Sequence, residues 1–592
     1  MLDPYTIRQQ FPALRRVVGG RTAVYFDGPG GTQVPQSVID AMTGFMEAGG
    51  SNLGGPFATS VETEEVVDGA RQAIADLFNA DPNEIAFGQN MTSLTFAMSR
   101  ALAATWEPGD EIVLTKLDHD ANVRPWVLAA ADAGVSVRWA DVKPRDGVSF
   151  DYESLEDALS EKTKLVAVTA ASNATGTVVD VRQVTRMAHR VGALVYVDAV
   201  HYTPHQLVDV AAIDCDFVAA SAYKFFGPHT GVLYGRKRLL DSLTAYKVEP
   251  ASDHPPEKWE TGTQSFESLA GVTAAVDYMA TLGGGGSDRR AALRNAYRSI
   301  QQYEEVLAAR LQAGLERIDG ITIYGLTDGR DRTPTYAIDV AGQSAQRVSE
   351  LLGAVGIFVW AGHYYAVEVM RRLGVLDSGG LVRIGLTHYN TDAEVDRLLN
   401  ALEHIAAGRD PSAASELAPR VAGGAMEPYE AFGSDGLPDP RHASRGTLAA
   451  GLAEVVAVEG PMTEDRAYQV FIKASGGKKV TKPVRDDLSW ALDLLVREGR
   501  VETEELTISD GERQRILRLP EMPRVRMREL GDRDLYKVPI TEVAEVVADV
   551  VHTDRSLDDE AVKRATLERY GLKRLTDSAD AYLEAARRVA GV

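Results

Sequence analysis

The sequence predicts an α/β protein with a mainly parallel sheet, followed by a small α+β lobe and a mostly helical extension. Three patterns support this prediction. Residues 75–240 alternate short apolar runs with helical stretches, residues 288–386 combine one long helix with separated strands, and residues 407–446 are rich in Ala, Gly, Pro and Ser. With 592 residues, 45% of them hydrophobic, the chain can fill the cores of several globular domains.

The parallel sheet is predicted from short apolar, β-branched runs with helical patterns such as Val181–Val191 between them. Strands separated by helices are typical of crossover units, in which the strands are parallel and buried. The predicted strands are Ile112–Thr115, Leu165–Thr169, Leu194–Asp198 and Phe217–Ala220.

The small lobe is expected after residues 283–287, a glycine-rich segment that predicts a turn or loop. A long helix is expected over residues 288–316. Strands are expected at Thr322–Tyr324, Tyr336–Val340 and Val382–Leu386, with a helix before the last of them. This order of elements predicts a compact α+β lobe.

The C-terminal part is predicted from residue 407 onward. Residues 407–446 show no sustained periodicity and therefore predict a linker. Two similar segments follow, each with an apolar helix, an acidic helix start, a glycine–lysine turn and a final amphipathic helix. We expect a winged-helix-like module over 447–530 and a second helical module over 531–592, with Val501–Ile508 and Arg515–Leu519 as the wing of the first.

The charge is distributed unevenly. The whole chain has a net charge of −22, residues 441–592 hold 26 basic and 28 acidic residues, and the preceding part therefore has a net charge of −20. An acidic body argues against nonspecific nucleic-acid binding through that body. The single cysteine, Cys215, cannot form an internal disulfide or a cysteine-rich metal site. Because no apolar run reaches the length of a signal peptide or a membrane span, we expect a soluble cytoplasmic protein.

Two residues at strand ends point to chemistry. Lys224 follows an apolar strand, where withdrawal from water would lower its pKa and suit a covalent bond to an aldehyde. Asp198 ends another buried strand, at the edge of the sheet where α/β proteins bind ligands. Taken alone, such a lysine is more often a surface residue, and such an aspartate can simply cap a helix.

A third candidate is the turn into the helix that begins near Asn90. Free N–H groups at a helix start bind phosphate, and the hydroxyl groups of Thr92 and Ser93 could add donors. Ordinary helix capping by Asn90 or Thr92 is the alternative interpretation.

Together these motifs resemble the class V aminotransferases, which are pyridoxal phosphate (PLP) enzymes of fold type I, and within them the cysteine desulfurase and selenocysteine lyase group. The resemblance spans roughly residues 20–405, and the segment Tyr25–Pro35 is similar to the family's YLDxAAxxxxP motif. It implies an N-terminal arm over 1–20 that belongs to the small lobe, a PLP-binding large domain over 21–285 and a small lobe over 286–406. It also implies a homodimer with shared active sites.

The resemblance assigns roles to individual residues. It matches Lys224 to the lysine that holds PLP covalently and Asp198 to the partner of the pyridine nitrogen. The further cofactor contacts that it implies are His119 stacked on the ring, His201 and Asn173 near the phenolate oxygen, Asn90, Met91 and Thr92 at the phosphate, Ser221 and Tyr223 beside the lysine, and Thr263 at the phosphate of the neighbouring subunit. Arg383, together with Asn173, matches the clamp of the substrate carboxylate, a task that suits a bidentate guanidinium.

One feature departs from the desulfurase pattern. Tyr365 stands where the related RTGHHC motif has its persulfide-forming cysteine, and Trp360 stands where it has an arginine. Cys215 is expected to be buried packing near a strand start. We expect His119, His363 and Tyr365 to act as acids or bases, and Trp360 and Tyr364 to line the substrate site, although loop packing is as good an account of Tyr364.

These inferences predict a PLP-dependent enzyme acting on a small α-amino acid. The reaction that they favour is that of a desulfurase-like lyase, which cleaves a C–S bond or eliminates at the β carbon without a persulfide. Transamination and epimerisation remain open, and no metal motif is found. Two other hypotheses are a PLP-sensing regulator whose C-terminal modules bind DNA and an enzyme whose tail recruits a partner carrying the substrate. For the tail itself, docking, nucleic-acid contact and a substrate lid stay open.

Overall fold

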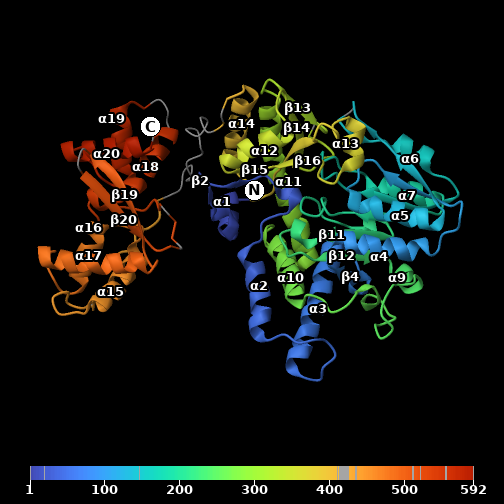
Figure 1. Cartoon of the computed structure of the whole chain (residues 1–592), viewed down its shortest axis with the longest axis horizontal. Coiled ribbons are helices and arrows are strands. Elements are labelled where there is room, and N and C mark those ends of the chain that lie inside the picture. Colours follow the sequence, from blue (N-terminus) through green and yellow to red (C-terminus); the bar gives the residue numbers. More distant parts are fainter. Residues whose placement is uncertain are drawn as a thin grey trace. The chain divides into compact units, whose positions relative to one another are not determined.

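The computed structural model describes residues 2–18, 21–145, 147–327, 329–409, 411, 426–433, 436–509, 512–520, 522–523, 525–553 and 557–590. The chain divides into two compact units, Met1–Leu417 and Ala418–Val592 (Figure 1).

The first unit is built on a seven-stranded sheet in the order β4-β12-β11-β10-β9-β5-β6. Strand β12 is antiparallel to both neighbours, whereas the remaining pairs are parallel. The four strands predicted from the sequence lie within β5, β9, β10 and β11, which confirms the mainly parallel sheet. The strands are β4 (Ile85–Gly88), β5 (Glu111–Thr115), β6 (Ser136–Ala140), β9 (Thr163–Thr169), β10 (Leu194–Asp198), β11 (Phe217–Ser221) and β12 (Gly231–Gly235).

Both faces of this sheet are buried, as the continuous apolar runs predicted. In β10, Val195 and Val197 pack in one core cluster and Tyr196 packs in the other. Helices α3 (Ala58–Phe78), α7 (Val181–Arg190) and α10 (Phe266–Thr281) contribute to the first cluster, and α4 (Met91–Ala103) and α5 (Arg124–Ala133) to the second. Further helices of this unit are α1 (Pro4–Gln9), α2 (Gln36–Ala48), α6 (Tyr152–Ala158), α8 (Val210–Ile213), α9 (Lys237–Ser242) and α13 (Val367–Leu373).

The small lobe follows the long helix α11 (Arg289–Leu315), close to the predicted 288–316. Its antiparallel sheet has the order β13-β14-β17-β16, and α12 (Ala345–Ala354) and α14 (Asp392–Ala406) share its core. The predicted strands of this lobe are confirmed, although β17 ends one residue earlier than expected. The strands are β13 (Ile321–Tyr324), β14 (Thr335–Val340), β16 (Trp360–Gly362) and β17 (Leu381–Gly385).

The N-terminal segment packs in the cores of both lobes. Strand β3 (Val24–Tyr25) pairs in parallel with β15 (Ile357–Phe358), and Val24 and Phe26 lie in the core of the small lobe. Phe11 and Tyr25, in contrast, lie in the core of the large lobe. The pairing of β3 with β15 brings the next residues, which start at Asp27, beside β17.

The second unit contains two groups of helices and one sheet. The first group has the order α15 (Arg445–Glu459), β18 (Met462–Thr463), α16 (Glu464–Ala474), α17 (Lys482–Arg497), β19 (Glu502–Ser509) and β20 (Glu512–Arg518), and its sheet has the order β18-β20-β19. The second group is α18 (Ile540–Thr553), α19 (Asp559–Arg569) and α20 (Asp577–Ala590).

The hairpin β19–β20 is shared by both groups. Leu517 lies in the core formed by α15, α16 and α17, whereas the preceding residue, Ile516, lies in the core formed by α18, α19 and α20. Successive residues of a strand point to opposite faces, so the hairpin is packed on both sides. The two groups are therefore joined through this sheet.

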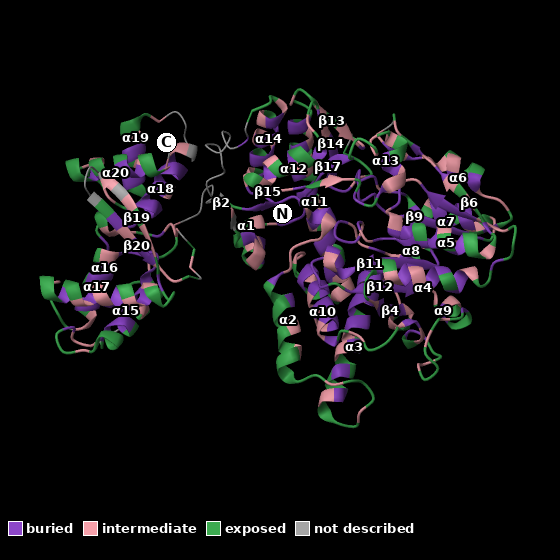
Figure 2. Cartoon of the chain, viewed as in Figure 1, coloured by how far each residue is buried: buried purple, intermediate pink, exposed green. Residues whose placement is uncertain are grey.

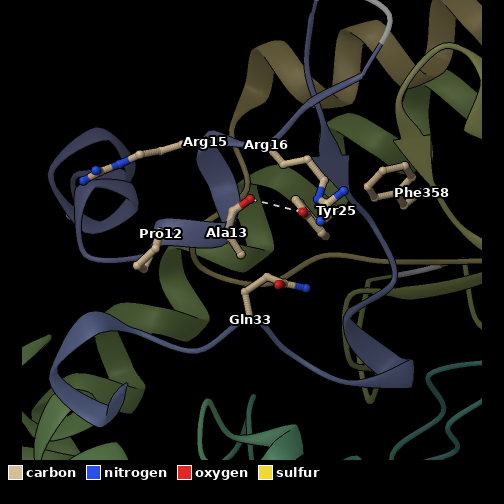
Figure 3. A pocket seen from close by; sticks show the side chains of 7 residues that line it. All are labelled: Pro12, Ala13, Arg15, Arg16, Tyr25, Gln33 and Phe358. Carbon is tan, nitrogen blue, oxygen red and sulfur yellow. Dashed lines mark hydrogen bonds between the residues drawn. The ribbon is translucent and has the colours of Figure 1, made fainter. Parts of the chain in front are cut away.

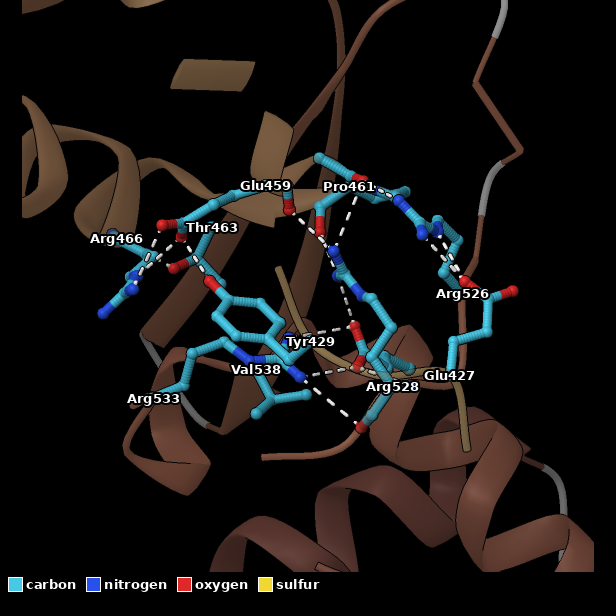
Figure 4. Close-up of polar contacts among 12 residues, drawn as sticks. Glu427, Tyr429, Glu459, Pro461, Thr463, Arg466, Arg526, Arg528, Arg533 and Val538 are labelled. Carbon is cyan, nitrogen blue, oxygen red and sulfur yellow. Dashed lines mark hydrogen bonds and ion pairs between the residues drawn. The ribbon is translucent and has the colours of Figure 1, made fainter. Parts of the chain in front are cut away.

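A buried ionic network also joins the two groups (Figure 4). Arg528 and Arg533 both pair with Glu542 of α18, at 2.6 and 3.0 Å, and all three side chains are buried. Arg528 also donates hydrogen bonds to the carbonyl oxygens of Glu459 and Pro461, at 2.7 and 2.6 Å. Because removing one member would leave a buried charge without its partner, the network holds α15 and α18 together.

The segment predicted as a linker is only partly one. Residues 412–425 lie outside the described residues, but several residues after them pack into the second unit. The hydroxyl of Tyr429 donates a hydrogen bond to Glu459, the N–H of Phe432 donates to the same carboxylate at 2.9 Å, and Leu437 lies in the core. Composition alone did not distinguish these anchoring residues from a linker.

Candidate active site

Lys224 lies at the centre of a cluster of charged and aromatic side chains. It follows β11 in a short 3-10 helix, Ala222–Lys224, and only 9% of the residue is exposed. Its Nζ donates a hydrogen bond to the carbonyl oxygen of Pro29 and lies 4.8 Å from the ring centre of Tyr223. Burial, assisted by the Arg383 cation, lowers the pKa of Lys224 to about 7. About half of the amine is therefore unprotonated and available as a nucleophile at neutral pH.

Asp198 occupies the end of β10, beside β11. Strand register pairs it with Ala219, five residues before Lys224. The carboxylate accepts a hydrogen bond from the N–H of Val200 at 2.9 Å and is buried. Burial raises its pKa to about 6, although the nearby Lys224 acts in the opposite direction. This arrangement suits an acid that binds a protonated ring nitrogen.

Arg383 comes from the middle of β17. Its Nη1 donates to the carbonyl oxygen of Asn173 at 3.0 Å, and its guanidinium lies 4.4 Å from the ring centre of Tyr364. The amide nitrogen of Asn173 donates in turn to the carbonyl of Tyr364 at 2.9 Å. Burial lowers the pKa of Arg383 to about 10, so it stays charged at neutral pH.

Three buried polar atoms in this cluster have no hydrogen-bond partner: Nε of Arg383, Oδ1 of Asn173 and Oδ1 of Asp27. Such atoms are costly, and a bound molecule would satisfy them. They give a physical reason for expecting a polar ligand here.

His119 follows β5 and precedes a short 3-10 helix, Asp120–Asn122. Its Nδ1 accepts a hydrogen bond from the N–H of Ala121 at 3.0 Å, which leaves the proton of the neutral ring on Nε2. Burial, assisted by the Lys224 and Arg383 cations, lowers the pKa of His119 to about 3. The ring is neutral and stacks against Tyr365, with 5.4 Å between ring centres.

The loop after β16 forms another wall of the site. Tyr364 and Tyr365 both have left-handed backbone, with φ of 51° and 58°, which side chains other than glycine seldom adopt. The N–H of Tyr365 donates to Nδ1 of His363 at 3.1 Å, and its carbonyl accepts from Asp120 at 2.7 Å. Tyr364 is buried, whereas Tyr365 is 65% exposed and Trp360 and His363 are also exposed. The strained backbone thus presents Tyr365 at the mouth of the site.

The N-terminus of α4 lies against the end of β11. Asn90 caps the helix through a hydrogen bond from the N–H of Ser93 at 2.9 Å, so the capping interpretation is confirmed for Asn90. The N–H of Met91 donates to Oγ of Ser221 at 3.0 Å, and Thr92 is exposed. A Cβ at Gly231 would lie 2.5 Å from the backbone carbon of Asn90, so only glycine allows this close approach.

His201 lies deeper in the first unit. Its Nε2 is 3.1 and 3.0 Å from the hydroxyl oxygens of Thr333 and Thr335, and its ring contacts that of His205. Burial holds the pKa of His201 well below its usual value, so the ring is neutral. The described residues show no contact between Thr263, which is exposed, and this cluster.

Asp27 was not among the residues that the sequence singled out. It follows the short strand β3, and it joins the site because that strand pairs with the small lobe. Burial raises its pKa to about 6, whereas the Arg383 and Lys224 cations act in the opposite direction. The aspartate was visible inside the segment Tyr25–Pro35, but its approach to β17 depends on a pairing across more than 300 residues.

An open pocket of about 670 Å³ lies outside this cluster (Figure 3). Its lining includes Tyr25 and Gln33, which flank the Asp27 segment, together with Arg15, Arg16 and Phe358. It does not include Lys224, so it is not the reaction site. In the described residues, no group of three or more His, Cys, Asp or Glu side chains could hold a metal ion, and no helix is long and apolar enough to cross a membrane.

Comparison with known proteins identifies the family. The model of the class V aminotransferases matches residues 24–398, which is more than half of the chain. The chain belongs to the class V aminotransferase family. It lies within the PLP fold type I architecture that cysteine desulfurase structures also show, and its C-terminal unit extends beyond the family match.

Individual relatives support the same assignment. The chain is 32% identical over 409 residues to an aminotransferase-like protein, FGM3, of Gibberella zeae, a match that covers 67% of this chain and 97% of the relative. It is 32% identical over 418 residues to a probable cysteine desulfurase of Synechocystis, covering 67% and 94%. The structure of the apo cysteine desulfurase from Thermococcus onnurineus NA1 is 26% identical, with a TM-score of 0.62, covering 69% and 99%. The protein is thus a cysteine desulfurase-like enzyme of the class V aminotransferase family.

Proposed function

We propose that this enzyme uses PLP to cleave a bond at the β carbon of a small α-amino acid, as a C–S or β-eliminating lyase that forms no persulfide on a cysteine. The proposal depends on one observation: the Lys224 amine is buried beside Asp198 and Arg383, with its pKa lowered to about 7. The unpartnered Arg383 Nε and Asn173 Oδ1 show that the residues fit a polar ligand here.

The residues that would hold the cofactor come from four parts of the fold. Lys224 would hold it covalently, Asp198 would bind its ring nitrogen and His119 would cover its ring. The N-terminus of α4, with Asn90, Met91 and Thr92, would bind the phosphate beside Ser221, and His201 would face the phenolate oxygen. When bound, PLP withdraws electrons from the substrate's α carbon.

The protein groups would divide the remaining work. Arg383, which is buried and oriented by its hydrogen bond to Asn173 and by the Tyr364 ring, would bind the substrate carboxylate. The Lys224 amine, with a pKa near 7, would carry a proton to and from the α carbon. His119 is neutral and carries its proton on Nε2, so it would donate to the leaving group; His363 and Tyr365 at the mouth are the other acid–base candidates.

Elimination without a persulfide is supported by the position of the chain's one cysteine. Cys215 is fully buried two residues before β11, and burial raises the pKa of its thiol far above neutrality. A thiol must ionise and reach its partner to accept sulfur. Tyr365, which stands at the exposed loop position, has no thiol to offer.

The decisive experiment compares the absorbance spectra of the purified protein and of Lys224→Ala with a panel of amino acids. We expect the purified wild-type protein to absorb at about 420 nm and to release a keto acid and ammonia from its amino-acid substrate. The variant should lose both signals, whereas Lys237→Ala, on the exposed face of α9, should keep them. Amino-group transfer or loss of optical activity in place of keto acid would assign transamination or epimerisation instead.

We also propose a homodimer with shared sites. Helix α2 and the beginning of α3 are largely exposed (Figure 2). Met46, Leu53, Phe57 and Val61 in this region are large exposed apolar side chains, and such a group suits a protein interface. Light scattering should report a dimer, and Phe57→Asp should weaken it while Lys237→Ala does not.

For the C-terminal unit we propose a winged-helix-like docking role. The order of its first group of elements supports this proposal, because a hairpin follows three helices as a wing does. Both faces of that hairpin are packed, and the exposed charges of α17 are mixed, with Lys482 and Arg485 beside Asp486, which does not make a basic recognition surface. The DNA-binding regulator predicts a gel shift with promoter DNA and no turnover, whereas the docking role predicts turnover and no shift.

A further inference from the structure

Asp27 has a buried carboxylate oxygen that nothing in the protein explains. The residue lies between β3 and a short 3-10 helix, Gly28–Gly30, and its backbone forms a bridge to Gly385 at the end of β17. It starts the 3-10 helix but makes no capping hydrogen bond through its side chain. The most ordinary structural use of an aspartate at that position is therefore absent.

The two cations that lower the pKa of Asp27, Lys224 and Arg383, both donate hydrogen bonds to backbone carbonyl groups. The Lys224 amine donates to the carbonyl of Pro29, and Nη1 of Arg383 donates to the carbonyl of Asn173. Oδ1 of Asp27 is buried and has no hydrogen-bond partner, and among the described residues no ion pair includes this carboxylate. A buried carboxylate oxygen left in this state costs free energy unless a further donor reaches it.

The missing donor must fit a site that also contains a free guanidinium nitrogen. Arg383 Nε, like Asp27 Oδ1, is buried without a partner, and the backbone bridge between Asp27 and Gly385, two residues after Arg383 on β17, places the two residues side by side. A cation and an anion that each keep one buried atom without a partner match a ligand bearing both charges. An α-amino acid carries them on one carbon.

We propose that Asp27 binds the α-ammonium group of the substrate while Arg383 binds its carboxylate, so that the two residues recognise the zwitterion before it reacts. The inference deepens the proposed function and rests on it. Asp27 then takes one proton: an N–H bond of the ammonium breaks, an O–H bond forms on Oδ1, and the amine keeps the electron pair that makes it a nucleophile. The raised pKa of Asp27 supports this transfer, because a carboxylate that is costly to keep charged accepts a proton more readily.

The test compares two ligands that differ only in the amino group, L-alanine and propionate, on the PLP-loaded protein. L-alanine binding is followed by the absorbance change near about 420 nm, and propionate binding by its competition with L-alanine. Asp27→Asn should weaken L-alanine by about tenfold or more, the value of a hydrogen bond to a charged group, and leave propionate within about twofold. Arg383→Lys, the control, should weaken both ligands.

The outcomes separate the alternatives. Equal weakening of both ligands by Asp27→Asn would show a merely structural role and overturn the inference, as would unchanged L-alanine affinity. If Asp27→Asn does not fold, Asp27→Ser is measured in the same way. A wild-type protein that binds no PLP would refute the proposed function itself, whereas a loaded protein whose Asp27 variants do not discriminate between the two ligands would refute this inference alone.

Discussion

The apoprotein of Asp27→Asn should be more stable than the wild-type apoprotein at pH 7.5, although the substitution removes a native charge. Burial raises the pKa of Asp27 from 3.8 to about 6. That difference of about two units corresponds to roughly 3 kcal/mol at about 1.4 kcal/mol per unit. Because the amide of the variant is also buried, the gain should be somewhat smaller than this value.

The sign of the stability difference between Asp27→Asn and wild type depends on pH. The folded protein binds the proton of the Asp27 carboxyl group more tightly than the unfolded chain does. The stability that this proton contributes is complete below about pH 4 and is lost as the pH rises through about 6. The advantage of Asp27→Asn should therefore be present at pH 7.5 and vanish at pH 4. Groups that do not interact with Asp27 titrate equally in the two proteins and cancel in the difference, whereas the attraction between Asp27 and the Lys224 cation is already included in the pKa of Asp27.

The assay is urea unfolding of the two apoproteins in a Trp490→Phe background. The other five tryptophans then all lie in the first unit, so fluorescence reports that unit alone. Asp132→Asn, which changes an exposed carboxylate on α5, serves as the control and should show no pH-dependent difference. A difference between Asp27→Asn and wild type that stays constant from pH 4 to pH 7.5 would refute the reasoning.

Three further predictions follow from the packing and the charges. Glu542→Ala leaves two buried arginines unpaired and should destabilise the C-terminal unit by about 3–5 kcal/mol, measured by hydrogen exchange in α18, whereas Glu560→Ala breaks an exposed pair and should cost less than about 1 kcal/mol. Gly231→Ala would place a Cβ 2.5 Å from the backbone before α4 and should weaken PLP binding in equilibrium dialysis, while Gly44→Ala meets nothing within 4 Å and should leave it unchanged. The rate of PLP loading should rise with pH and level off above about pH 8, because the pKa of Lys224 is lowered to about 7; a rate that keeps rising about tenfold per unit would show an ordinary lysine.

The sequence predicted what depends on local pattern. Buried β-branched runs located β9 and β10, and because the strand ends of a parallel sheet meet at one edge, Asp198 and Lys224 were expected together. The family resemblance added Arg383 and Asn173, which the structure places in contact.

What the sequence did not predict depends on contacts between distant segments or on unusual burial. Asp27 reaches the site only through the pairing of β3 with β15. Arg528 is buried against Glu542, although arginine side chains are usually exposed, and no local pattern in the sequence indicated this burial. The consecutive apolar residues Ile516 and Leu517 were a sign that both faces of the hairpin are covered, since a half-exposed strand alternates.

The contact of the segment around β3 with the small lobe has a consequence for synthesis on the ribosome. The amide of Asn390 donates to the carbonyl of Tyr25 at 3.0 Å, so the amino-terminal wall of the site is completed by residues made 365 positions later. Until those residues leave the exit tunnel, the nascent chain has its lysine but lacks the arginine and the wall around it. A product truncated before this point would be unable to assemble a competent catalytic centre.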